Sequence, residues 1–176
     1  MKSESLQRML MFAAMFCAGS GCAAAGGPKD PCGLVSTVPD PFAGTMRGFN
    51  LYLDYGGYTA VGMEEAKGKY KLKVLVILNG SSRSAGAVGD KGEFAVGDKV
   101  LTFENQKDAQ PVANSNSRGV FTQWILEYAL TGEQATALIQ APLKGVKVNV
   151  GGEIFQLALN ELQGLQVQNS VTCMTK

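Results

Sequence analysis

Histidine is absent from this chain of 176 residues. Its absence excludes the Ser-His-Asp and Cys-His arrangements that activate a nucleophile, zinc sites with histidine ligands, and proton transfer through an imidazole. The sequence also lacks the phosphate-binding loop G-x-x-x-x-G-K-[ST], and no G-x-S-x-G turn of a hydrolase occurs in its folded part. We therefore expect no bound cofactor and no catalysis by these routes.

The chain also has almost no net charge. It holds 16 Lys and Arg against 15 Asp and Glu, a formal net charge of +1. Nucleic-acid binders usually carry a marked excess of Lys and Arg on one face, so nucleic acid is not an expected partner. Hydrophobic residues make up 45% of the chain, enough to fill a core, and the length suits one domain.

The N-terminus has the composition of an export signal. Lys2 and Arg8 precede an uncharged apolar run over residues 9–18, which is too short to span a bilayer as a helix. Small residues follow this run. We predict that residues 1–21 form a signal peptide, rather than an apolar helix of the fold.

The residues that end this segment resemble the lipobox of bacterial lipoproteins. Ser20 and Gly21 fit the positions before the cysteine of that motif, Cys22 is the cysteine itself, and Gly19 stands where the family prefers Leu. The resemblance implies that Cys22 is acylated, with palmitate as a typical chain, and that the protein is anchored in the membrane. An Asp after the cysteine tends to retain Gram-negative lipoproteins at the inner membrane, so Ala23 implies the periplasm-facing side of the outer membrane. The alternative is ordinary cleavage near residues 23–25, which gives a soluble periplasmic or secreted protein.

Four cysteines are present, and two of them belong to the N-terminal segment: Cys17 lies in the apolar run and Cys22 in the lipobox. Export places the other two, Cys32 and Cys173, in an oxidising compartment where a disulfide persists. A redox or metal pair is the disfavoured alternative, because no C-x-x-C spacing and no histidine accompany them. We predict a Cys32–Cys173 bond that ties the two ends of the folded part together.

Proline and glycine are concentrated between the anchor and the domain. Residues 22–45 contain four prolines, which fix φ and remove a donor, so this segment is predicted to be a tether or an extended wrap. Residues 46–176 are predicted to form a single globular domain.

Strand patterns dominate the first part of this domain. Residues 49–55 and 58–63 are split by Gly56-Gly57, as in a hairpin, and residues 70–78 alternate Lys with apolar residues before becoming apolar throughout. The pentapeptide Ala-Val-Gly-Asp-Lys occurs at 87–91 and again at 95–99, which predicts two successive turns and a strand over residues 99–104. Residues 120–130 fit a strand or a helix, and we favour the strand because a helix start follows directly.

The C-terminal third combines helix and hairpin signals. Thr131 and Gln134 match a capping box, and so do Asn160 and Gln163, each opening a short helix. Between them, residues 145–150 and 153–159 flank Gly151-Gly152 as a hairpin. This unit resembles the tail of exported bacterial proteins of the invasion-associated locus B type, from which no residue role is carried over. The predicted class is α+β: a mainly antiparallel sheet with two short helices in the C-terminal third.

Four groups of residues have compositions that occur in binding or catalytic sites. Ser82-Arg83-Ser84, with Asn79 and Gly80 beside it, has the composition of an anion-binding turn, but a polar hairpin loop is the favoured interpretation. Asp90, Glu93 and Asp98 have glycine neighbours, as in calcium loops, but Lys91 and Lys99 oppose a cation and the ligands are too few. Paired carboxylates among Glu64, Glu127 and Glu153 leave a glycosidase mechanism open. The tyrosines Tyr52, Tyr55 and Tyr58 are expected to pack within a sheet rather than to form one binding patch.

These observations favour an exported, lipid-anchored, non-enzymatic module that binds or supports another envelope protein. The rival class is a periplasmic hydrolase that uses a carboxylate pair. A carboxylate pair with a raised pKa in a deep pocket would favour the hydrolase. An exposed edge strand or apolar patch without such a pocket would favour the binding module.

Overall fold

The computed structural model describes residues 30–40, 44–53, 59–81, 84–116, 119–150 and 152–176. Ten strands and two helices lie in these ranges. In chain order they are β1 (Ser36–Asp40), β2 (Gly44–Tyr52), β3 (Thr59–Ala66), β4 (Lys69–Asn79), β5 (Lys91–Val96), β6 (Lys99–Glu104), β7 (Val112–Asn116), β8 (Gly119–Ala129), α2 (Gly132–Gln140), β9 (Leu143–Val150), β10 (Glu153–Ala158) and α3 (Glu161–Thr175). The predicted α+β class with mainly antiparallel strands is confirmed.

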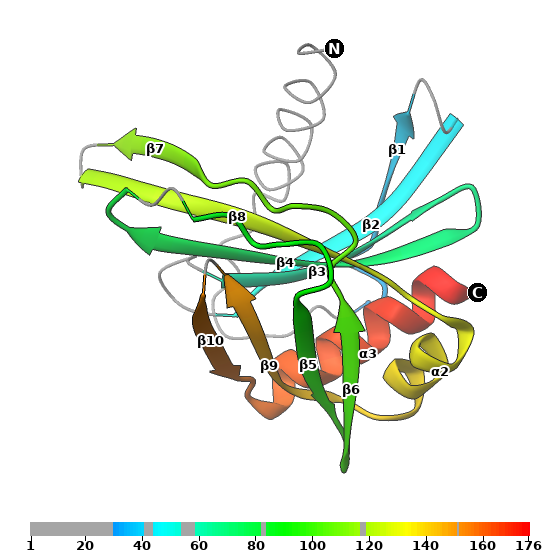
Figure 1. The fold of residues 1–176 in the computed structure, drawn as a ribbon. Helices are drawn as coiled ribbons and strands as arrows, with labels where there is room; N and C mark the ends of the chain where they lie inside the picture. The colour runs from blue at the N-terminus through cyan, green and yellow to red at the C-terminus, as the bar shows by residue number, and fades with distance from the viewer. Residues whose placement is uncertain (1–29, 41–43, 54–58, 82–83, 117–118, 151) are drawn as a thin grey trace.

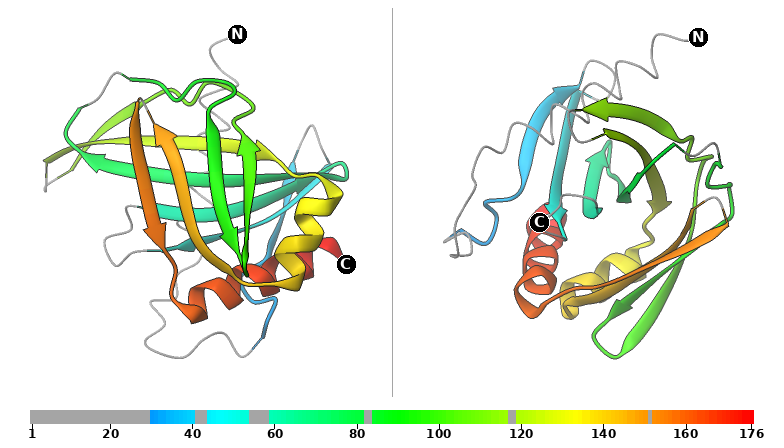
Figure 2. Two further views of the ribbon diagram at one scale, coloured as in Figure 1. Left: turned by 60° about the horizontal axis from the view of Figure 1, so that its bottom comes forward. Right: turned by 90° about the vertical axis from the view of Figure 1, so that its left-hand side faces the viewer.

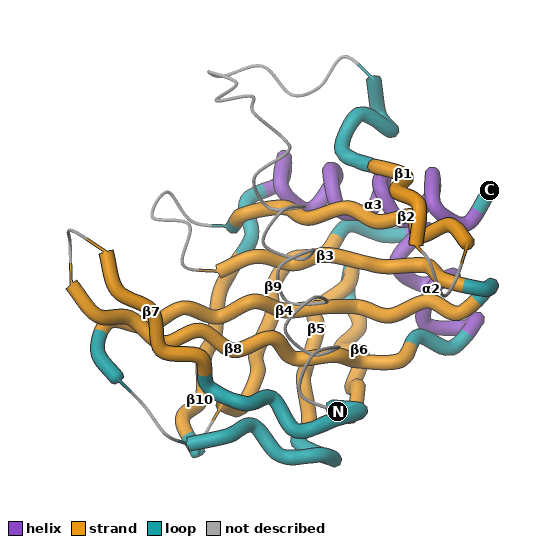
Figure 3. The backbone as a smooth tube through the Cα atoms, turned by 90° about the horizontal axis from the view of Figure 1, so that it is seen from above, coloured by secondary structure: helices purple, strands orange, loops and turns teal. Residues whose placement is uncertain are grey.

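The strands form two antiparallel sheets. The larger has the order β1-β2-β3-β4-β8-β7, and the smaller has the order β10-β9-β5-β6. Figures 1 and 3 show that the strands of one sheet cross those of the other steeply. The core lies between the sheets, where alternate residues of each strand point inward, among them Phe49, Val74, Phe94, Trp124 and Val148.

Most of the predicted strand pairs are present. β2 and β3 form the first of the predicted hairpins, although its Gly56-Gly57 turn lies outside the described residues. Both copies of the repeated pentapeptide make turns, one before β5 and one between β5 and β6, where Gly97 has a φ of 56°. β8 is a strand, as favoured, and β9 pairs with β10 in the hairpin predicted near the C-terminus.

Both helices begin at the predicted capping boxes. The Thr131 side chain accepts from the backbone N–H of Gln134, and the Asn160 side chain accepts from that of Gln163. α3 has 15 residues and is longer than the short helix that the pattern predicted, because residues 167–173 continue it. It packs on β9 of one sheet and on β2 and β3 of the other, so its length closes one side of the space between the sheets (Figure 2).

Gly164 lets α3 approach the smaller sheet closely. A Cβ atom at this position would lie 2.4 Å from the backbone oxygen of Leu143, at the start of β9. No side chain fits at that distance without moving one of the two elements. This contact explains why a glycine, unfavourable in a helix interior, occupies the fourth helical position.

The N-terminal arm is held to the body at two places. In the stretch for which a tether or an extended wrap was predicted, Ser36–Asp40 is β1, which pairs with β2. Cys32 is joined to Cys173 in the last turn of α3, with the two Cα atoms 5.7 Å apart. The disulfide predicted from the cysteine positions is therefore present in the structure.

Candidate functional sites

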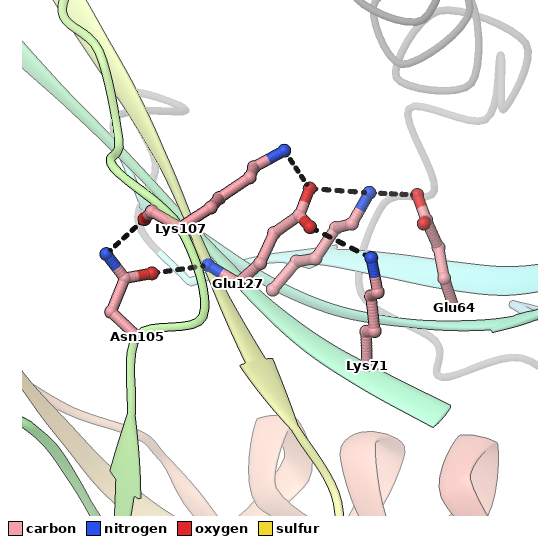
Figure 4. A network of polar contacts seen from close by, with 6 residues as sticks. Glu64, Lys71, Asn105, Lys107 and Glu127 are labelled. Carbon is pink, nitrogen blue, oxygen red and sulfur yellow. Dashed lines mark hydrogen bonds and ion pairs between the residues drawn. The ribbon is translucent and has the colours of Figure 1, made fainter. Parts of the chain in front are cut away.

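A cluster of charged side chains lies on the face of the larger sheet that points away from the core. Glu64 of β3, Lys71 and Lys73 of β4, Glu127 of β8 and Lys107 of the loop after β6 meet there; we call these five residues the ionic cluster (Figure 4). Only 8% of Lys73 and 7% of Glu127 is exposed. Charged residues are seldom buried to this extent unless they are paired.

Glu127 is the acceptor at the centre of the cluster. Its carboxylate lies 2.7 Å from Lys107 Nζ, 3.2 Å from Lys71 Nζ and 3.6 Å from Lys73 Nζ. Lys73 also donates to the carboxylate of Glu64, so a lysine stands between the two glutamates.

Strand register brings these residues together. Lys73 lies directly opposite Glu127 in the β4–β8 pair, and Lys71 lies opposite Glu64 in the β3–β4 pair. Asn105 fixes the third partner, because its side-chain amide donates to the Lys107 carbonyl oxygen at 2.6 Å while its Oδ1 accepts from the Glu127 backbone N–H.

The charges around Glu127 decide whether Glu64 and Glu127 could act together as a glycosidase pair. Burial alone would raise the pKa of Glu127, but the attraction of Lys73, the hydrogen bond and charge of Lys107, and the charge of Lys71 together lower it from 4.5 to about 2. A glycosidase needs one carboxyl group that stays protonated near neutral pH. Glu127 is held ionised instead, so it does not supply the general acid that such a mechanism requires.

Glu153, the third carboxylate named for a glycosidase pair, lies outside the ionic cluster. It lines a cavity of about 300 Å³ at one end of the molecule, together with Leu78, Asn79, Gly80, Ser81, Ser84, Thr122, Trp124 and Val150. The cavity is built on ordered contacts, since Trp124 Nε1 donates to the Ser84 carbonyl oxygen at 2.9 Å and Thr122 Oγ1 donates to that of Gly80 at 2.8 Å.

Part of the turn considered for anion binding, residues 79–84, lines this same cavity. Asn79, Gly80 and Ser84 line it, whereas Ser82 and Arg83 lie outside the described residues. Its described lining holds no Lys or Arg, and Glu153 is the one charged side chain among them, which opposes an anion.

The residues considered for calcium are held apart by other partners. Asp90 accepts from the Ala87 backbone N–H, Glu93 pairs with Lys147, and Asp98 pairs with Lys144. Within the described ranges, no group of three or more His, Cys, Asp or Glu side chains is arranged to hold a metal ion. Of the three tyrosines, Tyr52 is exposed at the end of β2, and Tyr55 and Tyr58 lie outside the described residues.

The outer edge of β10 is a feature that sequence reasoning missed. β10 is the last strand of the smaller sheet, and no described strand pairs with its outer side (Figure 2). Leu159 N donates to Lys144 O, so in this hairpin the odd-numbered residues bond to β9. The antiparallel alternation then directs the backbone N–H and C=O groups of Ile154, Gln156 and Ala158 away from the sheet.

The other three edges carry features that discourage pairing with a further strand. β1 contains Pro39 and Asp40, β7 is short and polar, and on β6 the carbonyl oxygen of Thr102 accepts from the Gln134 side chain of α2. β10 has the sequence Glu-Ile-Phe-Gln-Leu-Ala, with no proline, no lysine and one charge at its first position. Natural edge strands are usually protected by such devices, so β10 is a candidate site for strand addition.

Apolar side chains accompany this edge. Ile154 is 67% exposed, and Phe155 and Leu157 are partly buried against the core. Leu162 and Leu165, in the first turns of the helix that follows, are exposed as well. Exposed apolar side chains are typical of an interaction surface where they form one contiguous patch.

Cys22 lies outside the described residues. Neither of the two described helices has the length and hydrophobicity that crossing a membrane requires. No protein-family model, curated protein or solved structure matches the chain.

Proposed function

We propose that this chain is an exported envelope protein, anchored by a lipid on Cys22, whose folded part is a non-enzymatic binding or accessory module for another envelope component. That component docks as an extended strand on β10. The proposed place is the periplasm-facing side of the outer membrane, where the lipobox resemblance and Ala23 direct it.

The observation that carries this proposal is the outer edge of β10, with which no strand in the described part of the chain pairs. Strand addition gains its affinity from backbone hydrogen bonds and its specificity from alternate side chains. The β10 edge offers three alternate residues for the bonds, and Phe155 and Leu157 offer partly exposed apolar surface on the core side. The ionised state of Glu127 supports a binding role over the hydrolase, because this buried carboxylate is held by lysines and is not a proton donor at neutral pH.

The disulfide limits how far the domain stands from its anchor. About ten residues separate Cys22 from Cys32, and a fully extended chain of that length spans at most about 35 Å. Cys32 is bound to the end of α3, so an acyl chain on Cys22 would hold the domain close to the membrane surface.

Replacing Cys22 with alanine is expected to remove the anchor. The variant should incorporate no palmitate analogue during growth and should move from the membrane pellet to the soluble fraction after cell disruption. Cys17→Ala is the matched control, because Cys17 lies in the segment predicted to be removed, and it should behave as the parent chain. A Cys22→Ala protein that still sediments with membranes would show that the lipobox interpretation is wrong.

A photo-reactive side chain on β10 tests the binding role. A benzophenone amino acid at Ile154 is expected to form a covalent adduct with the docked component when cells are irradiated. Val100 is the matched control, since it is 64% exposed against 67% for Ile154 but sits on the β6 edge, where Gln134 engages the neighbouring backbone. Equal adducts from both positions, or none from Ile154, would contradict docking at β10.

A further inference from the structure

We infer that the strand docked on β10 is β10 of a second copy of this chain, paired antiparallel about a two-fold axis at Gln156. The inference rests on the proposed function, since it names the component that occupies the same edge. The smaller sheets of the two copies would then join into one continuous sheet of eight strands.

The backbone of β10 is self-complementary in this register. Its three outward-directed residues are evenly spaced around Gln156, so Ile154 meets Ala158 of the other copy while Gln156 meets its own counterpart. Each such pair exchanges two hydrogen bonds, which gives about six across the interface. Moving the axis by one residue in either direction leaves one of the three residues unpaired and reduces the number to about four.

The side chains agree with the same register. On the core side, Phe155 of each copy would lie opposite Leu157 of the other, which extends the apolar layer that both residues already join. On the outer side, Ile154 would lie against Ala158, a large side chain against a small one. Both pairings place apolar beside apolar.

Charge does not oppose two copies. Glu153 is the only ionisable residue of β10, and in this register it lies near Leu159 of the other copy, far from the second Glu153. The whole chain has a net charge of +1, so long-range repulsion between copies is weak.

The axis at Gln156 permits a sharp test with the full-length protein in its export compartment. Facing residues of a hydrogen-bonded pair have Cα atoms about 5.5 Å apart, within the range that a disulfide spans. The variant Gln156→Cys is therefore expected to run mostly as a disulfide-linked dimer on a non-reducing gel. Ile154→Cys alone should stay monomeric, because its counterpart faces Ala158, and the double variant Ile154→Cys with Ala158→Cys should again dimerise.

A second variant tests the contact without a new thiol. Gln156→Lys would place two like charges opposite each other at the axis and is expected to convert a detergent-solubilised dimer into a monomer. Gln156 is exposed in the single copy, so the monomeric variant should unfold at the same temperature as the parent chain diluted until it is monomeric. Loss of the dimer with an unchanged monomer would support the inference.

The outcomes separate this inference from the proposed function. If Gln156→Cys stays monomeric while the benzophenone at Ile154 captures a different protein, the second copy is excluded and strand addition stands. If neither experiment yields an adduct, both ideas fail. Equal disulfide dimers from Gln156→Cys and Ile154→Cys would indicate random collision and would also overturn the two-fold pairing.

Discussion

Replacing Glu127 with glutamine is expected to lower the free energy of unfolding by about 3 kcal/mol at pH 7. The substitution keeps the shape of the side chain but leaves the buried amine of Lys73 with Glu64 as its one carboxylate partner in the cluster, while the positive charges of Lys71 and Lys107 remain nearby. Removing one partner of a buried ion pair usually costs about 3–5 kcal/mol, because the remaining charge stays desolvated.

The pH dependence of stability gives an independent readout. The pKa of Glu127 is about 2 in the folded chain against 4.5 in the unfolded chain, so ionisation favours the folded state. A depressed pKa contributes stability that is fully present above pH 4.5 and is lost as the pH falls toward 2. The difference corresponds to about 3 kcal/mol, and the Gln variant should lack this part of the acid-induced loss.

Glu93→Gln is the matched control for this prediction. Glu93 also pairs with a lysine of a neighbouring strand, at 3.0 Å, but both side chains are more than two-fifths exposed. An exposed pair contributes about 0–1 kcal/mol. Urea unfolding of the parent and both variants between pH 2 and pH 7 measures the effects. If Glu127→Gln lost no more stability than Glu93→Gln, the ionised Glu127 would not stabilise the fold by compensating the buried charge of Lys73.

The parts of the fold that depend on local sequence were predictable. Gly97 between two apolar runs marks a tight turn, and Thr131 with Gln134 marks a helix start, because the necessary partners lie within a few residues. The length of a helix was harder to predict from local sequence. α3 continues past Gly164 because that residue packs against the backbone of Leu143, which is a contact between distant parts of the chain.

The features of the candidate sites depend on contacts between distant strands. Glu64 and Glu127 stood out as residue types, but their meeting at Lys73 depends on the register of β3, β4 and β8. The β9–β10 hairpin was predicted, whereas the position of β10 at the edge follows from the order of the described strands in the sheet. Lys71 and Lys73 alternate with apolar residues as on any half-exposed strand, so no local signal marked them as partners of a buried carboxylate.

Replacing both Cys32 and Cys173 with serine is expected to have the largest effect of all, a loss of roughly 4–5 kcal/mol of unfolding free energy. The disulfide closes a loop with a sequence separation of 141 residues, and in the chain-entropy model a loop of this length strongly restricts the unfolded chain. Because the unfolded variant is less restricted, it should also expose more surface, which raises the urea m-value.

The native contacts around Cys173 predict where the variant opens first. Arg47 donates to the carbonyl oxygen of Cys173 at 2.8 Å and Tyr70 donates to that of Met174 at 3.3 Å, so the end of α3 stays attached to β2 and β4 without the disulfide. Among the described residues before β1, residues 30–35 accept or donate no such hydrogen bond with α3, so they should become the first site of limited proteolysis. The parent chain treated with a reductant is the control and should reproduce the variant. If the double variant retained the parent stability within about 1 kcal/mol, the unfolded chain would already be compact enough that closing this loop costs little entropy.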